Sequence, residues 1–249
     1  MRKEVMYIQS SLPIARNTIE MVLKNYYISQ TAIPGQFLHL FIDGLSLRRP
    51  ISIADVDREK ETVTILFKKE GTGTKRLAMY QEGMTLDVLG PNGNGFKLDK
   101  ECSRILLVGG GIGVPPLYYL GKTLAKQDMK IISLLGFQSA EYVFYREKFQ
   151  ALGETWMVTN DGSYGEKGFV TDVLDKIEDV DRYYSCGPMP MLQAVTKKLE
   201  HKQGYVSLEE RMGCGIGACL ACVIPRTNDR GYYKICKDGP VFRAKEVAL

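Results

Sequence analysis

Arg104-Ile105-Leu106-Leu107-Val108-Gly109-Gly110-Gly111-Ile112-Gly113 is the stretch that decides the fold class. Its apolar run leads straight into glycines, which predicts a strand buried on both faces and then a tight turn. A helical pattern follows over residues 117–126, and a second apolar strand over residues 130–135. Buried strands that alternate with helices are typical of a parallel α/β sheet, and we expect one here.

More α/β units extend this pattern along the chain. Strands are predicted over residues 155–158 and 182–186, and a helix with one apolar face over residues 189–201. We therefore expect a central parallel α/β domain over residues 99–205. Its glycine turn, with Gly110, Gly111 and Gly113, could hold a pyrophosphate or could be a tight turn without a ligand.

Residues 1–98 read as short strands separated by Pro, Gly, Asn and Asp. Apolar and polar residues alternate around residues 62–67, as expected for a strand with one buried face. Many strands at this spacing predict an antiparallel β-barrel, with a short crossing helix over residues 75–80. The predicted strands cover residues 5–9, 18–24, 36–42, 51–54, 62–68 and 85–88.

Four cysteines gather near the C-terminus, in a predicted module over residues 206–249. Cys214, Cys219 and Cys222 have C-x4-C-x2-C spacing, and Cys236 follows after thirteen residues. This is the ligand pattern of a plant-type [2Fe–2S] cluster, which transfers single electrons. We expect a hairpin over residues 220–235, with Cys236 on a strand.

Composition excludes several classes of protein. The chain has 249 residues, of which 45% are hydrophobic and 25% charged, and its net charge is +4. No dense basic cluster indicates nucleic-acid binding, and no segment reads as a signal peptide or a membrane span. Clustered rather than dispersed cysteines fit metal binding in a reducing compartment, so a cytoplasmic protein is expected.

Three motifs together resemble the ferredoxin–NADP reductase superfamily. They are Arg49-Pro50-Ile51-Ser52, the loop Gly111-x-Gly113-x-x-Pro116, and Cys186-Gly187-Pro188-Met189-Pro190-Met191. In that superfamily a flavin-binding barrel precedes a nicotinamide-binding α/β domain. The resemblance implies that the first motif contacts the flavin and that the other two lie near the nicotinamide nucleotide. The implied nucleotide contacts are Gly110, Gly111, Gly113, Cys186, Gly187 and Pro188.

The likeness narrows to the electron-transfer subunits of type B dihydroorotate dehydrogenases. It extends over almost the whole chain, and residues 207–222, which include the first three cysteines, are its most specific part. The resemblance implies FAD, a [2Fe–2S] cluster and NAD as cofactors. The implied FAD contacts are Arg49, Pro50, Ile51, Ser52, Leu66, Phe67, Lys68, Gly73 and Thr74, and the implied cluster ligands are Cys214, Cys219, Cys222 and Cys236.

An activity and an assembly follow from this resemblance. A separate FMN-containing subunit would oxidise dihydroorotate for pyrimidine (UMP) biosynthesis, and this chain would pass the electrons through its cluster and FAD to NAD+. Two catalytic and two electron-transfer subunits are expected to form a heterotetramer. Alone, the chain is expected to oxidise NADH with artificial acceptors.

Some alternatives remain open from the sequence. The same architecture occurs in flavin and iron–sulfur subunits of NAD(P)H:ferredoxin oxidoreductases and sulfhydrogenases, and four thiols can also hold a structural zinc ion. No side chain is a certain catalytic acid or base. Cys186 has either a structural role or a place near the nicotinamide, and Cys102 is expected to be an inert thiol.

Other residues near the expected nucleotide site are equally ambiguous. Glu141 would disfavour a 2′-phosphate and so favours NAD over NADP, whereas the nearby Arg146 leaves NADP open. Residues 159–163 either line the dinucleotide site or form a surface turn. His39 and His201 are expected to be packing or surface residues.

Overall fold

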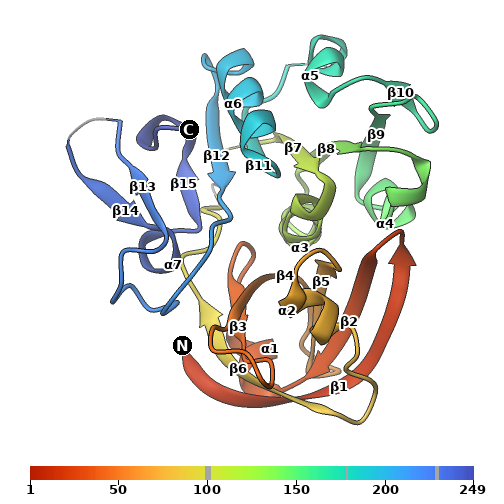
Figure 1. The fold of residues 1–249 in the computed structure, drawn as a ribbon. Helices are drawn as coiled ribbons and strands as arrows, with labels where there is room; N and C mark the ends of the chain where they lie inside the picture. Colours follow the sequence, from red (N-terminus) through yellow and green to blue (C-terminus); the bar gives the residue numbers. More distant parts are fainter. Residues whose placement is uncertain (99–101, 178, 228–229) are drawn as a thin grey trace.

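The computed structural model describes residues 1–98, 102–177, 179–227 and 230–249. They fold into a closed barrel, a seven-stranded sheet and a two-stranded hairpin (Figure 1). This architecture confirms the predicted fold class, with the barrel at the N-terminus and the α/β sheet in the centre. The predicted division between residues 98 and 99 falls at the edge of the described residues and stays a prediction.

The N-terminal barrel closes by antiparallel pairing in the order β1-β2-β5-β4-β3-β6. Its interior is filled by apolar side chains that alternate along the strands, such as Met21, Leu23 and Ile65, which are fully buried. Its strands and helices are β1 (Arg2–Ala15), β2 (Thr18–Lys24), α1 (Tyr26–Thr31), β3 (Phe37–Leu40), β4 (Arg49–Asp57), β5 (Thr62–Lys68), α2 (Thr72–Leu77) and β6 (Thr85–Asn92).

The second sheet has the order β10-β9-β8-β7-β11-β12-β15. Its first six strands are parallel, and β15 pairs antiparallel with β12. The strands are β7 (Arg104–Gly110), β8 (Lys130–Phe137), β9 (Gly153–Thr159), β10 (Glu166–Lys167), β11 (Arg182–Cys186), β12 (Gln203–Ser207) and β15 (Val241–Arg243). The predicted division at residue 206 lies inside β12 and stays a prediction.

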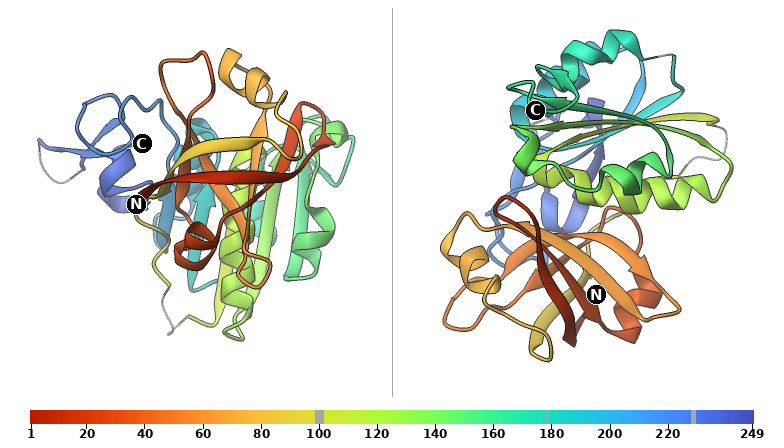
Figure 2. Two further views of the ribbon diagram at one scale, coloured as in Figure 1. Left: turned by 90° about the horizontal axis from the view of Figure 1, so that it is seen from below. Right: turned by 90° about the vertical axis from the view of Figure 1, so that its right-hand side faces the viewer.

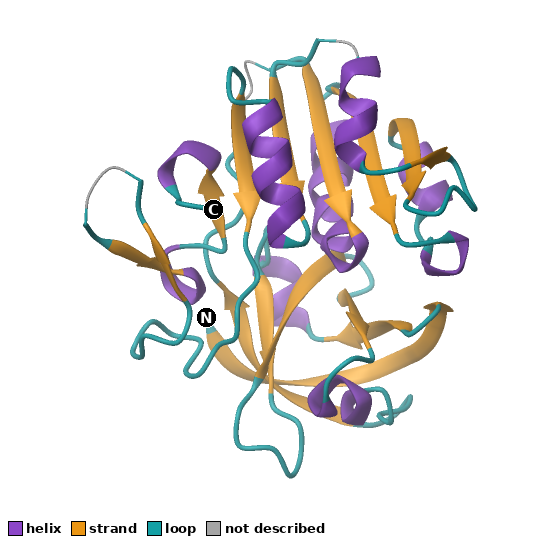
Figure 3. Ribbon diagram, turned by 45° about the horizontal axis from the view of Figure 1, so that its top comes forward, coloured by secondary structure: helices purple, strands orange, loops and turns teal. Residues whose placement is uncertain are grey.

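Helices cover both faces of this sheet, because successive residues of a buried strand point to opposite sides. Leu106 and Val108 of β7 pack with α5 and α6, whereas Ile105 and Leu107 pack with α3. Figure 3 shows these layers above the barrel. The helices are η1 (Gly111–Gly113), α3 (Val114–Ala125), η2 (Ala140–Tyr142), α4 (Arg146–Gln150), α5 (Val170–Val173), η3 (Leu174–Lys176) and α6 (Met189–Lys198).

Helix α3 lies between the sheet and the barrel (Figure 2). The hydroxyl of Tyr119 on α3 donates a hydrogen bond of 2.9 Å to the carbonyl oxygen of Ala32. Lys122, one turn further along, forms an ion pair of 2.5 Å with Asp55 of β4. These contacts fix the glycine turn at the start of α3 relative to the barrel.

The C-terminal segment forms a hairpin beside both larger units (Figure 1). It comprises β13 (Val223–Pro225), β14 (Tyr232–Lys234), α7 (Ile235–Asp238) and η4 (Ala244–Glu246), in addition to β15. The predicted hairpin is therefore confirmed. The prediction of a strand at Cys236 is wrong, because the chain turns into α7 immediately after β14. No helix of the described residues is long and apolar enough to cross a membrane.

Candidate functional site

A cavity of about 740 Å³ opens where the barrel, the α/β sheet and the C-terminal segment meet. Its barrel wall comes from β4, β5 and α2, and Ile112, Pro115 and residues 208–212 form the opposite side. All nine residues implied as FAD contacts line this one cavity: Arg49, Pro50, Ile51, Ser52, Leu66, Phe67, Lys68, Gly73 and Thr74. Their contact with FAD stays a prediction.

Arg49 is held at the wall of this cavity by its neighbours. Its Nη1 donates a hydrogen bond of 2.6 Å to the carbonyl oxygen of Leu47. Its Nε lies against Gly73, where an added Cβ would come within 2.3 Å. A guanidinium fixed in this way can bind a pyrophosphate through paired hydrogen bonds, so the cavity fits FAD.

A second cavity, of about 450 Å³, lies at the carboxyl ends of the parallel strands. Ligands of open α/β sheets bind at this edge. Three residues implied as nucleotide contacts, Gly110, Gly111 and Pro188, line it, whereas Gly113, Cys186 and Gly187 do not. The structure thus brings together half of the implied nucleotide set.

Gly113 and Cys186 instead form a close backbone contact beneath this cavity. A Cβ at Gly113 would lie 2.4 Å from the carbonyl oxygen of Cys186 and 2.5 Å from the amide nitrogen of Gly187. The Cys186 side chain is fully buried, and burial raises its thiol pKa above the usual range. This burial supports the structural reading of Cys186, and its place near the nicotinamide stays a prediction.

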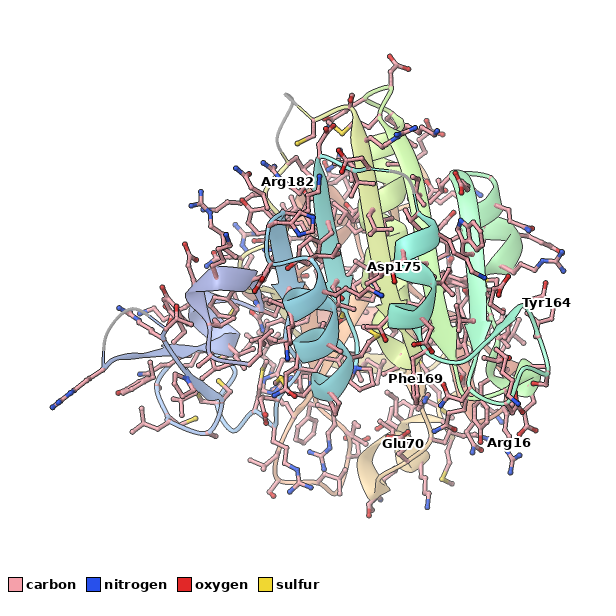
Figure 4. The ribbon with its side chains drawn as sticks, turned by 90° about the horizontal axis from the view of Figure 1, so that it is seen from above. Arg16, Glu70, Tyr164, Phe169, Asp175 and Arg182 are labelled. Carbon is pink, nitrogen blue, oxygen red and sulfur yellow. The ribbon has the colours of Figure 1, made fainter. Side chains whose placement is uncertain are left out.

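Other cavity residues were not predicted. Gln138 follows β8, and Phe169, a residue that is 63% exposed, lies between β10 and α5 (Figure 4). Asn160, from the ambiguous segment 159–163, also lines the cavity. Gln138 and Asn160 directly follow parallel strands, a signal that could have identified them, whereas Phe169 carries no local signal.

Lys68 lines both cavities. Its Nζ lies 3.8 Å from a carboxylate oxygen of Glu70 and 5.8 Å from the ring centroid of Tyr142. A Cβ added at Gly111 would lie 3.5 Å from the same Nζ. The ammonium group therefore reaches from the end of β5 to the glycine turn and is placed to contact an anion there.

The two residues weighed for NAD or NADP preference lie outside the lining of the second cavity. Glu141 forms an ion pair with Arg16, which lies on the turn between β1 and β2. Arg146 lies with its guanidinium carbon 5.4 Å from the ring centroid of Tyr164. Neither side chain therefore decides the nucleotide preference from its position here.

The four clustered cysteines form two pairs. The amide of Cys219 donates to Sγ of Cys214 at 3.3 Å, and the amide of Cys236 donates to Sγ of Cys222 at 3.5 Å. The amide of Gly217 links the pairs by donating to Sγ of Cys236 at 3.1 Å.

The loop between the cysteines stabilises a thiolate. Burial raises the pKa of Cys214, but hydrogen bonds from the amides of Cys219 and Ile216 outweigh it and lower the pKa to about 6. Gly215 and Gly217 have φ of +70° and +81°, a left-handed backbone that favours glycine. The glycines let the loop turn its amides toward sulfur.

This donor set fits a [2Fe–2S] cluster, in which each iron takes two protein ligands. Among the described residues, no three His, Cys, Asp or Glu side chains form a group that could hold one metal ion. The two adjacent thiol pairs match the arrangement of a [2Fe–2S] cluster, with one pair for each iron.

The two histidines lie in different surroundings. His201 is exposed after α6, whereas the His39 side chain on β3 is fully buried. Burial, with a smaller effect of the Arg48 charge, lowers the His39 pKa to about 4. The His39 imidazole is therefore neutral near pH 7.

The barrel, the parallel sheet and the two cavities define a ferredoxin-reductase-like fold with a C-terminal cysteine module. Residues 107–197 match the oxidoreductase NAD-binding domain family. Residues 209–248 match the iron–sulfur cluster binding domain of dihydroorotate dehydrogenase B.

Full-length relatives carry the same description. The chain is 50% identical over 100% of both chains to a dihydroorotate dehydrogenase B (NAD(+)) electron transfer subunit of Bacillus cereus strain B4264. It is 51% identical, over 95% of this chain and 94% of the relative, to that of Shouchella clausii. The chain belongs to this family of electron transfer subunits.

Solved structures agree with the fold. A chain from the structure of an NADH-dependent reduced ferredoxin-NADP oxidoreductase superposes with a TM-score of 0.91 and 30% identity, covering 98% of this chain and 90% of that chain. A Neisseria gonorrhoeae ferredoxin NADP+ reductase with bound FAD and NADP has a TM-score of 0.70 at 17% identity. It covers 85% of this chain and 95% of that chain, and it supports the fold alone.

Proposed function

We propose that this chain carries electrons from a separate FMN-containing subunit, which oxidises dihydroorotate to orotate, to NAD+ in de novo pyrimidine biosynthesis. The four clustered cysteines would hold the cluster that receives single electrons, the larger cavity would hold FAD, and the second cavity would hold the nicotinamide nucleotide. FAD is the necessary junction because a flavin exchanges hydride with nicotinamide and single electrons with a cluster.

The observation that carries this proposal is the continuity of the three sites. Residues 208–212 form a wall of the larger cavity and lead directly to Cys214. At the other side, Lys68 lines both the larger cavity and the nucleotide cavity. The larger cavity therefore has the segment that leads to the cysteine loop at one wall and Lys68, which it shares with the nucleotide cavity, at another.

Each group of residues has a defined task in this proposal. Arg49 and Gly73 hold the FAD pyrophosphate, and the strand residues Ile51 and Ser52 border the flavin ring. Gly110 and Gly111 let the phosphates of NAD approach the backbone, because no side chain intervenes. The two cysteine pairs hold the two irons.

The assembly and the activity of the isolated chain belong to the same proposal. Two copies join two FMN-containing subunits in the cytoplasm, and a single copy oxidises NADH when an artificial acceptor is supplied. Mass measurement of the co-purified complex checks the stoichiometry, and NADH-dependent dye reduction checks the activity of the chain alone.

Co-expression with an FMN-containing dihydroorotate dehydrogenase subunit tests the function. The fully loaded complex is expected to reduce NAD+ when dihydroorotate is added, and each subunit alone is not. Failure of the loaded complex would overturn the assignment to pyrimidine synthesis.

A second candidate is a subunit of an NAD(P)H:ferredoxin oxidoreductase or a sulfhydrogenase. The superposition on the NADH-dependent reduced ferredoxin-NADP oxidoreductase chain favours it. An assay with reduced ferredoxin, in place of dihydroorotate and the FMN-containing subunit, distinguishes the two candidate functions of the cofactor-loaded chain. A zinc-clipped structural module predicts a colourless protein, whereas flavin with a cluster absorbs visible light.

A further inference from the structure

His39 lies where the barrel meets the cysteine loop. In β3 it is paired with Pro50 of β4, inside the implied flavin motif, and with Leu89 of β6. Its carbonyl oxygen accepts a hydrogen bond of 3.2 Å from Nη1 of Arg48, which lines the flavin cavity. The backbone of His39 is thus held in place by β4, β6 and the Arg48 side chain.

The side chain of His39 points away from the barrel interior. Leu38 and Leu40 belong to the barrel core, so the alternation of a strand directs Phe37 and His39 outward. Phe37 packs in the same apolar cluster as Cys222 and Cys236. The outward face of β3 is therefore the face against which the cysteine module packs.

The imidazole ring lies directly against the cysteine loop. A Cβ added at Gly215, the residue after Cys214, would come within 2.2 Å of His39 Nδ1 and 2.6 Å of Cε1. Glycine at this position leaves room for the ring. His39 is not among the described residues that line the larger cavity, so its ring faces the cysteine loop and not that cavity.

Both ring nitrogens of His39 are buried without a hydrogen-bond partner among the described residues. Buried polar atoms are nearly always paired, and a neutral imidazole offers one N–H donor. Within the part of the chain that the structure describes, the atoms around His39 supply no acceptor to either ring nitrogen. The missing acceptor is expected to be the group that the adjoining cysteines hold.

We propose that His39 is a positioning residue of the iron–sulfur site, and that its imidazole N–H donates a hydrogen bond to a sulfur atom of the bound cluster. The inference rests on the proposed function only in requiring a [2Fe–2S] cluster at the four cysteines. His39 then connects the barrel strands β3, β4 and β6 to the cluster. Hydrogen bonds to cluster sulfur stabilise the reduced cluster, which carries more negative charge, so the His39 N–H raises the reduction potential of the cluster.

Selective labelling tests the proposal in the full-length, cofactor-loaded chain. The sequence has two histidines, and His201 lies at the amino end of β12, whereas the cysteine loop follows the carboxyl end. Pulsed EPR of the reduced cluster in protein labelled with ¹⁵N-histidine is expected to show a weak coupling to one imidazole nitrogen. The coupling should disappear in His39→Leu and persist in His201→Gln.

Potentiometry supplies the second readout. His39→Leu removes the donor at similar volume and should shift the cluster potential to a more negative value, with the FAD potential unchanged. His39→Gln, which keeps an N–H donor, should give a smaller shift, and His201→Gln none. If His39→Leu fails to assemble the cluster, the ¹⁵N coupling in the wild type and the cluster potential of His39→Gln still test the proposal.

Distinct results would overturn the inference. A loaded cluster without histidine coupling, equal potentials in wild type and His39→Leu, or a coupling as large as that of a ligating nitrogen each contradicts it. A shift confined to FAD also contradicts it. Protein without a [2Fe–2S] cluster would refute the proposed function instead, and that result is recognised by its missing cluster spectrum before any variant is measured.

Discussion

The amide of Gly217 donates a hydrogen bond of 3.1 Å to Sγ of Cys236, nineteen residues further along the chain. This contact joins the glycine-rich loop to α7 and brings the two cysteine pairs together. Lys234 reinforces it, because its Nζ donates a hydrogen bond of 2.7 Å to the carbonyl oxygen of Gly217. The geometry of the cluster site therefore depends on the backbone conformation of one glycine.

Replacing Gly217 with alanine should lower the cluster content of purified protein. Its φ of +81° makes a Cβ unfavourable by about 1–2 kcal/mol, and that Cβ would also contact the Lys237 side chain. Iron and sulfide per FAD should fall several-fold. Gly83→Ala is the matched control, since Gly83 has φ of +84° with open space around it, and it should keep a full cluster.

Cys219→Ser should prevent cluster assembly and leave a folded barrel that binds FAD. The cysteine pairs lie outside the apolar core of the barrel, which is formed by the barrel's own strands and short helices together with Tyr119 of α3. Visible absorption should then show flavin alone, with one FAD per chain. Cys102→Ser should keep both chromophores, and loss of all folding in Cys219→Ser would mean that the cluster holds the fold together.

Lys68→Gln should weaken NADH binding and should make the NADH affinity less dependent on salt concentration. A hydrogen bond to a charged group contributes about 1.5–3 kcal/mol, so the Kd should rise at least about tenfold in calorimetric titration. Lys69→Gln, which removes the neighbouring charge outside both cavities, serves as the control. Equal affinities in the two variants would show that Lys68 does not contact the nucleotide.

Gly113→Ala should destabilise the nucleotide domain. The new methyl group would collide with backbone atoms of Cys186 and Gly187, which cannot rotate away, at an expected cost of about 1–3 kcal/mol. Thermal unfolding and NADH affinity should both decrease. Gly121→Ala in α3, the helix that follows Gly113, meets only the ends of the Leu107 and Leu152 side chains and should affect both less.

Elements with a regular apolar pattern were predictable from the sequence. The strands Thr18–Lys24, Thr62–Lys68 and Arg182–Cys186 have the predicted bounds. β1 was predicted over residues 5–9 but extends over Arg2–Ala15, because register shifts at Ile8/Ser10 and Pro13/Ala15 interrupt its alternation. β15 has three residues and forms by pairing with β12, so no local pattern indicates it.

The residues implied for FAD lie together in one cavity, whereas only half of those implied for the nucleotide line the second cavity, for a physical reason. The implied FAD contacts come from three short segments, each recognisable by itself. The nucleotide cavity joins loops that follow several strands, and Phe169 reaches it only through the folded positions of β10 and α5. Cys236 was identified as a candidate ligand, but its helical conformation depends on the turn after β14.

Anaerobic titration of the loaded chain with NADH, followed by EPR, tests the central claim most directly. If the chain holds one continuous electron path, NADH should bleach the flavin and also produce the signal of a reduced [2Fe–2S] cluster. In Cys219→Ser, NADH should bleach the flavin without producing the signal of a reduced cluster. A wild-type cluster that stays oxidised while its flavin is fully reduced, and that dithionite then reduces, would contradict the account.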